Sequence, residues 1–316
     1  MTQPPAAFAL EPHGQASSAV HRFAHKAMAS IFEVIIAGQE ERYARQAAEA
    51  AFDECDRLER ELSRFVPGSD VSQINGLRAG QFVRVGVATM ECLTAAAKVN
   101  AETGGVFDVT VGALIACFRG KDGAMRQPPA EEIAAAKART GMHLLDLRPH
   151  EFLVGVRADG VKVDTGGIGK GYAVDQMMAL LKEWGIEAAL VHGGMSSVLA
   201  IGAPPGQKGW LVSLRTPDGA DDGLGTLLLK DRSVSGSAQP PRRGYIIDPR
   251  TATLAAGPVA TWAAADSATV TDCLSTAFYI LKPAEVEEYC RRHPDDGAVV
   301  VVKDSSGRRV LRYGKW

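Results

Sequence analysis

The spacing of apolar residues changes about halfway along this 316-residue chain. In the first half, apolar side chains recur at three- and four-residue steps, the period of an amphipathic helix. This pattern predicts helices over 39–63 and 88–102, and a third within 126–141, where prolines precede the helical segment and a glycine follows it. The apolar segment 30–38, which ends in a glycine, predicts a strand before the first helix.

From residue 151 onward, short apolar and β-branched segments dominate. A hairpin is predicted over 152–164 with Asp159-Gly160 at its turn. Helices are predicted over 171–184 and from Ala268, with Pro283 interrupting the turn after the second. The other predicted strands are 187–192, 196–202, 210–215, 226–230, 244–248, 258–263, 297–303 and 308–313. Because strands and helices do not alternate strictly, the fold class is α+β, with mixed or antiparallel sheets and flanking helices.

Composition and charge narrow the class of protein. Hydrophobic residues make up 46% of the chain and charged residues 23%, as in ordinary globular proteins. A formal net charge of −2 and the absence of a Lys/Arg run argue against a nucleic-acid partner. The five cysteines form no CxxC pair, so we expect buried, reduced thiols and not disulfides or metal ligands.

The N-terminal segment 1–20 is rich in Pro, Ala, Ser and Gly, and we expect it to form a flexible tail. Residues 21–316 are expected to form a single domain. No stretch approaches the roughly 20 apolar residues of a membrane span. Because no charged leader precedes an apolar core, we expect a cytoplasmic protein, or a periplasmic one if a leader has been removed.

The glycine-rich segment VDTGGIGKGYAVD (163–175) raises the question of phosphate binding. It matches neither G-x-x-x-x-G-K-[S/T], because Gly171 follows Lys170, nor G-x-G-x-x-G, because Tyr172 takes the sixth place. Glycines nevertheless let backbone N–H groups approach an anion, and the following helix offers its positive end. The alternative is a strand-to-helix turn with a surface lysine.

Asp272 and Thr276 lie four residues apart in TVTDCLSTAFYIL (269–281), so a helix places them on one face. A carboxylate and a hydroxyl are hard oxygen donors of the kind that Mg²⁺ accepts. The alternative is a helix-capping acid followed by a threonine that bonds its own backbone.

The segment 233–257 offers further polar groups. Ser235, Ser237 and the Arg242-Arg243 pair are candidates to bind phosphate or ribose, and the turn Asp248-Pro249-Arg250-Thr251 holds an arginine in place. The alternative is a solvated loop between two strands.

Phe107 and Asp108 follow the flexible pair Gly104-Gly105, an arrangement suited to a planar heterocycle, although Phe107 could equally be a core residue. His192, at the end of a predicted strand, is favoured as a structural histidine over a catalytic one.

Five segments in register resemble the ApbE family of FAD:protein FMN transferases, over about residues 27–285. They are LSRFVPGSDVSQIN (62–75), TGGVFDVTVGAL (103–114), VDTGGIGKGYAVD (163–175), IIDPRT (246–251) and TDCLSTAF (271–278). The resemblance implies an α+β protein that binds FAD in a cleft between two closely packed halves, with Mg²⁺ or another divalent cation at the pyrophosphate. It also implies transfer of FMN from FAD to a Ser or Thr hydroxyl of an acceptor flavoprotein, with release of AMP.

The resemblance assigns roles to individual residues by motif position. Asp272, Thr276 and a backbone carbonyl near Gly167 would hold the metal. Asp272, Lys170 and Asp248 would be catalytic, with Lys170 or an arginine stabilising the leaving phosphate. The residues expected to contact FAD are Met28, Phe107, Asp108, Lys170, Ser235, Tyr245 and Arg250.

Tyr245 stands at one of the positions that depart from the family pattern, which reads H-I-I-D-P there; the Gly-Gly-Ile-Gly loop and HGGMSS also depart from it. A phenol with a pKa of about 10 is a poor general base at neutral pH. The acceptor's proton would then pass to Asp248, His192 or a metal-bound hydroxide. The alternative functions are an Mg²⁺-dependent FAD pyrophosphatase that yields FMN and AMP, and a non-catalytic FAD-binding protein.

Overall fold

The computed structural model describes residues 8–10, 20–120, 124–194, 196–216, 218, 223–238, 246–305 and 307–316. The expected tail over 1–20 therefore lies largely outside the described residues. Within it, β1 (Phe8–Leu10) is a short strand that pairs with β9 (Trp210–Leu214).

The chain forms two compact units. The first unit comprises Met1–Arg57, Lys170–Arg243 and Gly257–Trp316, and the second unit comprises Leu58–Gly169 and Gly244–Ala256. Two of the boundaries fall within helices, namely α1 (Glu41–Leu62) and the first turn of α6 (Gly169–Glu183). Each unit has its own sheets, and α1 contributes residues to both units.

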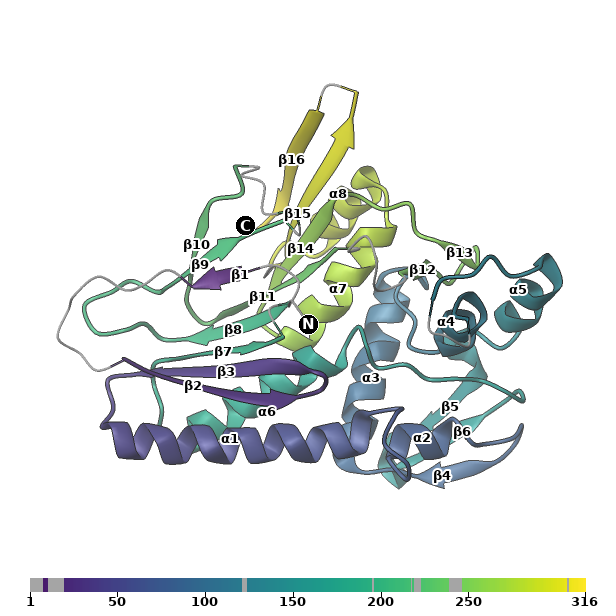
Figure 1. Cartoon of the computed structure of the whole chain (residues 1–316), viewed down its shortest axis with the longest axis horizontal. Coiled ribbons are helices and arrows are strands. Elements are labelled where there is room, and N and C mark those ends of the chain that lie inside the picture. Colours follow the sequence, from purple (N-terminus) through teal and green to yellow (C-terminus); the bar gives the residue numbers. More distant parts are fainter. Residues whose placement is uncertain are drawn as a thin grey trace. The chain divides into compact units, whose positions relative to one another are not determined.

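An eight-stranded antiparallel sheet forms the centre of the first unit (Figure 1). Its strand order is β16-β15-β14-β11-β8-β7-β3-β2, and every neighbouring pair is antiparallel. The strands are β2 (Val20–Ala27), β3 (Ser30–Ala37), β7 (Ala189–Gly193), β8 (Ser197–Ile201), β11 (Arg232–Ser237), β14 (Ala260–Ala265), β15 (Gly297–Asp304) and β16 (Gly307–Gly314).

Helices and a small sheet cover the two faces of this large sheet. Because side chains alternate along a strand, Phe32, Val34 and Ile36 of β3 share the face on which α6 packs, and all three are fully buried. Helix α7 (Ala268–Ile280) packs against β11 and β14, as Figure 1 shows. On the opposite face, Ile35 and Trp262 join an apolar core with Trp210 of β9, which pairs with β10 (Thr226–Leu229).

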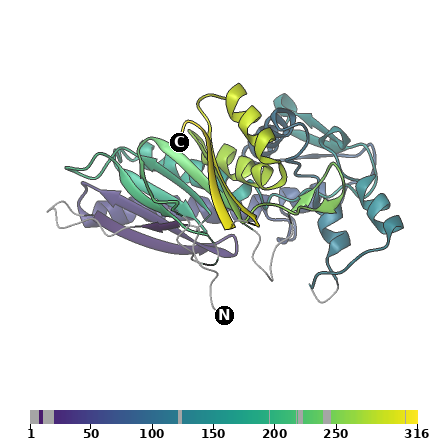
Figure 2. The ribbon, with the colours of Figure 1, turned by 90° about the horizontal axis from the view of Figure 1, so that it is seen from above.

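The C-terminal part of the first unit consists of one helix and a hairpin. Helix α8 (Pro283–Arg292) begins at Pro283, where the sequence predicted only an interruption, because proline at the first helical position loses no intrahelical hydrogen bond. Strands β15 and β16 follow and run side by side at the edge of the sheet, in yellow in Figure 2.

The second unit is built from short helices and two small sheets. Its helices are α2 (Asp70–Ile74), α3 (Val87–Glu102), α4 (Gly112–Phe118) and α5 (Ala130–Lys137), with 3-10 turns at Met142–Leu144 and Pro149–Glu151. One sheet has the order β4 (Phe82–Arg84), β6 (Leu153–Val156) and β5 (Leu145–Arg148). The other pairs β12 (Ile247–Asp248) with β13 (Thr253–Leu254).

The α+β prediction is confirmed, and the predicted helices 39–63, 88–102 and 171–184 correspond to α1, α3 and α6. The five cysteines are buried and reduced, as expected. Among the described residues, no helix is both long and apolar enough to cross a membrane.

The hairpin predicted over 152–164 is wrong, although the chain does turn at Asp159-Gly160. Strand β6 pairs instead with β4 and β5. After the turn the chain pairs with residues 109–112 instead, and the Asn75 side chain binds both backbone polar groups of Val163, with Nδ2···O at 2.9 Å and N···Oδ1 at 2.6 Å.

We expect Phe278→Ala to lower the free energy of unfolding by about 3–5 kcal/mol, because Phe278 is fully buried on α7 and packs edge-on against Tyr289. Urea unfolding followed by circular dichroism measures this change. The matched control is Phe65→Ala, at a side chain that is 73% exposed, with an expected change within about 0.5 kcal/mol. Similar losses for the two variants would contradict the core assignment.

Candidate functional site

The first turns of α6 and α7 approach each other closely in the first unit, at Gly171. A Cβ atom placed on Gly171 would lie 2.2 Å from the carbonyl oxygen of Ala268 and 2.7 Å from Cβ of Asp272. Only glycine fits at this point. The Gly171 N–H donates to Oδ2 of Asp272 across 3.0 Å, so the carboxylate of one helix bonds the first turn of the other.

Asp272 does not cap its own helix. Ser267 is the N-cap of α7, and its hydroxyl accepts a hydrogen bond from the N–H of Val270. Asp272 lies in the second turn, only 4% exposed, with its carboxylate directed at α6. The interpretation of Asp272 as a capping acid is therefore wrong, because a serine at the helix start performs that function.

Thr276 follows Asp272 by one helical turn and is half-buried. Its hydroxyl lies 3.4 Å from the carbonyl oxygen of Asp272 and 3.4 Å from Oγ of Ser237 on β11. Both distances are at the long end for a hydroxyl hydrogen bond, for which 2.5–3.0 Å is typical. The Thr276 oxygen is thus weakly held by these two neighbours.

The Asp272–Thr276 pair has the chemistry that a divalent cation requires. Mg²⁺ binds one or two carboxylates together with hydroxyl, carbonyl and water oxygens. Among the described residues, no group of three or more His, Cys, Asp and Glu side chains could hold a metal alone. A cation here would therefore depend on Asp272, the Thr276 hydroxyl and further oxygen donors, which fits Mg²⁺ better than a zinc site.

Ser235 is fully buried, and its hydroxyl lies 2.8 Å from Oγ1 of Thr271 on α7. Ser233 makes a similar contact with Thr271 at 2.9 Å. Ser237, two residues after Ser235 on the same face of β11, is the serine that contacts Thr276. Strand β11 therefore presents a row of hydroxyl groups to α7, and Ser237 is its member nearest the Asp272–Thr276 pair.

The start of β3, just after Met28, lies near Lys170 in the first unit. Met28 and Ala29 form the two-residue turn between β2 and β3, with φ angles of 50° and 55° that side-chain-bearing residues seldom adopt. Ser30 follows, and a Cβ atom on Gly194 would lie 2.4 Å from its Oγ and 3.2 Å from Cδ of Lys170. Gly194 thus separates the hairpin end from the Lys170 side chain.

Gly167 lies in the second unit, in the turn that leads into α6. The residues before it are held by the 62–75 segment. Nε of Arg64 lies 3.0 Å from Oδ2 of Asp164, whose Oδ1 accepts from the Gly166 N–H, and the Thr165 hydroxyl donates to the carbonyl oxygen of Leu62 at 2.8 Å. These contacts fix the backbone of the glycine-rich turn.

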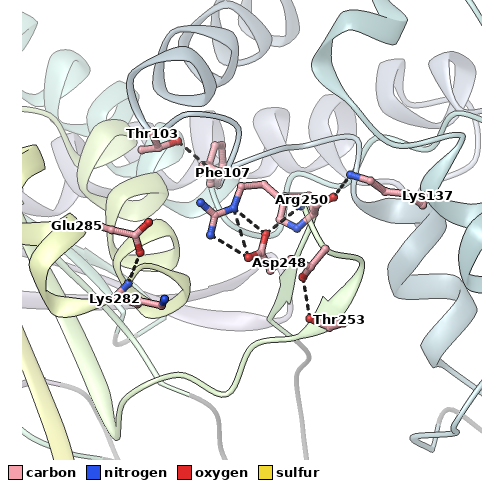
Figure 3. A network of polar contacts seen from close by, with 10 residues as sticks. Thr103, Phe107, Lys137, Asp248, Arg250, Thr253, Lys282 and Glu285 are labelled. Carbon is pink, nitrogen blue, oxygen red and sulfur yellow. Dashed lines mark hydrogen bonds and ion pairs between the residues drawn. The ribbon is translucent and has the colours of Figure 1, made fainter.

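Asp248 and Arg250 form a bidentate ion pair within the β12–β13 turn, which Figure 3 shows. Burial raises the pKa of Asp248, but the hydrogen bonds from Arg250 outweigh it and lower the pKa overall. The ammonium group of Lys137 donates to the carbonyl oxygen of Pro249 in the same turn. Asp248 is therefore a stable carboxylate and a weak base at neutral pH.

Phe107 is buried, at 4% exposure, and the Asn100 side chain donates to its carbonyl oxygen. Asp108 accepts hydrogen bonds from the N–H and hydroxyl of Thr110 and from the N–H of Met142. Burial raises the pKa of Asp108, and these hydrogen bonds offset the rise only in part. The hydrogen bonds of Phe107 and Asp108 hold the surrounding loops of the second unit in place.

His192 pairs with Glu33, its register partner across β7 and β3. Strand alternation places both side chains on the sheet face opposite Phe32, and so away from α6 and α7. This agrees with a structural histidine. Tyr245, Arg242 and Arg243 lie outside the described residues.

Two groups of expected site residues emerge. Lys170, Asp272 and Thr276 lie in the first two or three turns of α6 and α7 in the first unit, which also contains Met28 in the β2–β3 turn and Ser235 on β11. Gly167, Phe107, Asp108, Asp248 and Arg250 belong to the second unit. Sequence reasoning missed Asp175, whose carboxylate accepts hydrogen bonds from the start of α7; its signal in the sequence was its place in the glycine-rich segment.

We expect Asn75→Ala to lower the free energy of unfolding by about 1–3 kcal/mol, because Val163 would lose the partner of both its N–H and its C=O. Chemical denaturation measures the change. The control Gln73→Ala removes an exposed amide on α2 and should cost no more than about 0.5 kcal/mol. Equal stability of both variants would show that the Val163 contacts contribute nothing.

Glu33 gives a pH-dependent prediction. Burial raises its pKa, but hydrogen bonds from His192 and Arg22 outweigh this and lower the pKa from 4.5 to about 2. The charged form therefore stabilises the folded protein above pH 4.5, and this contribution disappears as the pH falls toward 2. We expect Glu33→Gln to lower the free energy of unfolding by about 1–3 kcal/mol at pH 7, with the difference vanishing near pH 2.

Denaturant unfolding at a series of pH values measures this effect. The control Glu49→Gln removes an exposed carboxylate from α1 and should leave the pH profile of stability unchanged. A Glu33→Gln difference that stays constant between pH 7 and pH 2 would contradict the assignment.

The chain is similar in sequence to the members of one protein family. A sequence model of the ApbE family matches residues 28–301. The FAD:protein FMN transferase of Salmonella typhimurium is 28% identical over 314 residues, covering 92% of this chain and 87% of that protein. The protein of the same name from Klebsiella pneumoniae is 27% identical over 302 residues, covering 89% and 84%.

Solved structures agree in fold. The ApbE protein from Thermotoga maritima has a TM-score of 0.82 at 26% identity and covers 93% of this chain and 97% of its own. The flavinyl transferase ApbE from Pseudomonas stutzeri, in its apo form, has a TM-score of 0.83 at 24% identity and covers 94% and 95%. Because the family model spans most of the chain, this protein belongs to the ApbE family.

Proposed function

We propose that this chain is an enzyme that transfers FMN from FAD to a protein. Membership of the ApbE family supports the proposal, as do several relatives named FAD:protein FMN transferase that match it over more than four fifths of its length. The alternative of a non-catalytic FAD-binding protein has less support, because the Asp272–Thr276 pair supplies donors suited to a catalytic cation.

The observation that carries the finer proposal is the arrangement of Asp272 and Thr276 beside the first turn of α6. We infer that transfer depends on Mg²⁺ or another divalent cation, held by these two side chains and a backbone carbonyl near Gly167. When bound, the cation would neutralise the charge that develops on the pyrophosphate oxygens of FAD.

The reaction we propose is a displacement at phosphorus. A Ser or Thr hydroxyl oxygen of the acceptor protein bonds to the FMN-side phosphorus, the bond from that phosphorus to the bridging oxygen breaks, and AMP leaves with that oxygen. Lys170, in the first turn of α6, carries a positive charge suited to bind phosphate and to stabilise the leaving group.

The acceptor hydroxyl must also lose a proton. His192 is unsuited to this task, because it pairs with Glu33 on the sheet face opposite α6 and α7. Asp248 has a lowered pKa and an ion pair with Arg250, which suits binding of a ligand better than proton abstraction. These observations suit Asp248 and Arg250 to FAD binding. When bound, a cation held by Asp272 and Thr276 would lower the pKa of a water or hydroxyl beside it.

The experiment combines purified protein, FAD, Mg²⁺ and a flavin-acceptor domain, and measures covalent flavin on the acceptor together with AMP. We expect labelled acceptor and AMP in equal amounts. We expect Asp272→Asn to lower the rate at least 100-fold, because the amide can still accept from Gly171 but carries no charge. The control Asp266→Asn, at a side chain that is 88% exposed, should retain activity.

Each other outcome has a definite meaning. AMP and free FMN without labelled acceptor would show an FAD pyrophosphatase. FAD binding without turnover at any metal concentration would show a binding protein and overturn the proposal. An unchanged rate for Asp272→Asn would contradict the metal assignment alone.

A further inference from the structure

We propose that Asp175 is a positioning residue that holds the candidate metal ligands Asp272 and Thr276 in place; its significance for metal binding rests on the function proposed above. Asp175 lies in the second turn of α6. It does not belong to the expected ligand set, and it acts entirely through α7.

The carboxylate of Asp175 binds the start of α7 at four points. Oδ1 accepts from the N–H of Ala268 at 2.8 Å. Oδ2 accepts from the hydroxyl of Ser267 at 2.7 Å, and from the N–H and hydroxyl of Thr269 at 2.8 and 2.6 Å. The first N–H groups of a helix have no intrahelical partner, so Asp175 supplies acceptors that α7 lacks. Its negative charge also lies at the positive end of the helix.

The arrangement is reciprocal. Asp175 of α6 binds amides in the first turn of α7, and Asp272 of α7 binds the amide of Gly171 in the first turn of α6. Each helix therefore provides a carboxylate to the other's N-terminus. Since Gly171 leaves no room for a Cβ atom against Ala268, the two first turns are held at one separation and one relative orientation.

These two reciprocal contacts between α6 and α7 determine where the Asp272 carboxylate points. With Oδ2 bound to the Gly171 N–H, the orientation of the carboxylate, and hence of Oδ1, is fixed. Loss of the Asp175 contacts would release the first turn of α7 and let Asp272 and Thr276 move together. Residues that orient metal ligands through hydrogen bonds typically change metal affinity by 10- to 100-fold when mutated.

Asp175→Asn is the sharpest substitution because it changes one atom and one charge. The amide nitrogen would face either the N–H of Ala268 or that of Thr269, and neither backbone donor can turn away. Thr269→Val, which removes only the hydroxyl contact, is a milder second variant, and Thr269→Ser should restore it. Glu183→Gln, at an exposed carboxylate near the end of α6, is the matched charge control.

Two measurements on the folded full-length chain test the proposal, each made well below the melting temperature of every variant. The first is Mn²⁺ affinity by calorimetric titration in the presence of FAD. We expect a loss of at least tenfold for Asp175→Asn, a smaller loss for Thr269→Val, and wild-type affinity for Thr269→Ser and Glu183→Gln.

The second measurement is hydrogen exchange at the Gly171 amide, which requires no metal. Because this N–H lies in the first turn of α6 and depends on Asp272 for its partner, we expect its protection to fall at least tenfold in Asp175→Asn and to stay unchanged in Glu183→Gln. If Asp175→Asn misfolds, the same comparison is made with Thr269→Val and Thr269→Ser.

The outcomes separate the proposed metal site from the positioning role of Asp175. If the wild-type chain binds no Mn²⁺, the metal part of the proposed function fails, and the Gly171 exchange still decides whether Asp175 positions Asp272. Unchanged Gly171 protection in the folded variants would overturn the positioning role. Wild-type Mn²⁺ affinity in folded Asp175→Asn would overturn its significance for metal binding.

Discussion

The contact between the first turns of α6 and α7 is the constraint on which the candidate site depends. Two helices can approach this closely only where one of them has no side chain, and Gly171 meets that condition. The close approach brings backbone N–H groups of each helix within reach of a carboxylate on the other. The same contact therefore stabilises two helix N-termini and fixes the position of the acidic side chain that the proposed chemistry requires.

The large sheet determines how α7 is rotated about its own axis. Thr271 and Ser275 face β11 and contact its serine hydroxyls, through bonds that are directional. In an α-helix each residue turns by about 100° from the one before, so Asp272 and Thr276 lie to one side of the sheet-facing pair. An interface of leucine side chains would let α7 rotate more freely about its axis, because apolar contacts are not directional. The hydrogen bonds of this row of buried hydroxyls specify one orientation of α7.

Local sequence signals were enough to predict long helices such as α1, because its apolar residues recur in consecutive turns, whereas the short helices α2 and α4 were not predicted. These signals failed for 152–164, where the turn at Asp159-Gly160 was visible but the partner of Val163 was a side chain 88 positions away in sequence. The pairing of Asp272 with Thr276 could be predicted from a four-residue step. The partnership of Asp175 with α7 could not, since it joins residues more than 90 positions apart and follows no periodic pattern.

The segments that resemble the ApbE family differ in their structural role. In the second unit, the 62–75 segment holds the backbone of 163–166 through Leu62, Arg64 and Asn75. Those residues support the glycine-rich turn, Leu62 through its backbone carbonyl and Arg64 and Asn75 through side chains that are already engaged by it. In the first unit, the contacts that Thr276 makes with the described residues are long, at 3.4 Å to Ser237 and to the Asp272 carbonyl, so its oxygen is held weakly and suits a ligand. A family motif thus combines scaffold residues with chemically available ones, and the hydrogen-bond partners of each side chain distinguish the two.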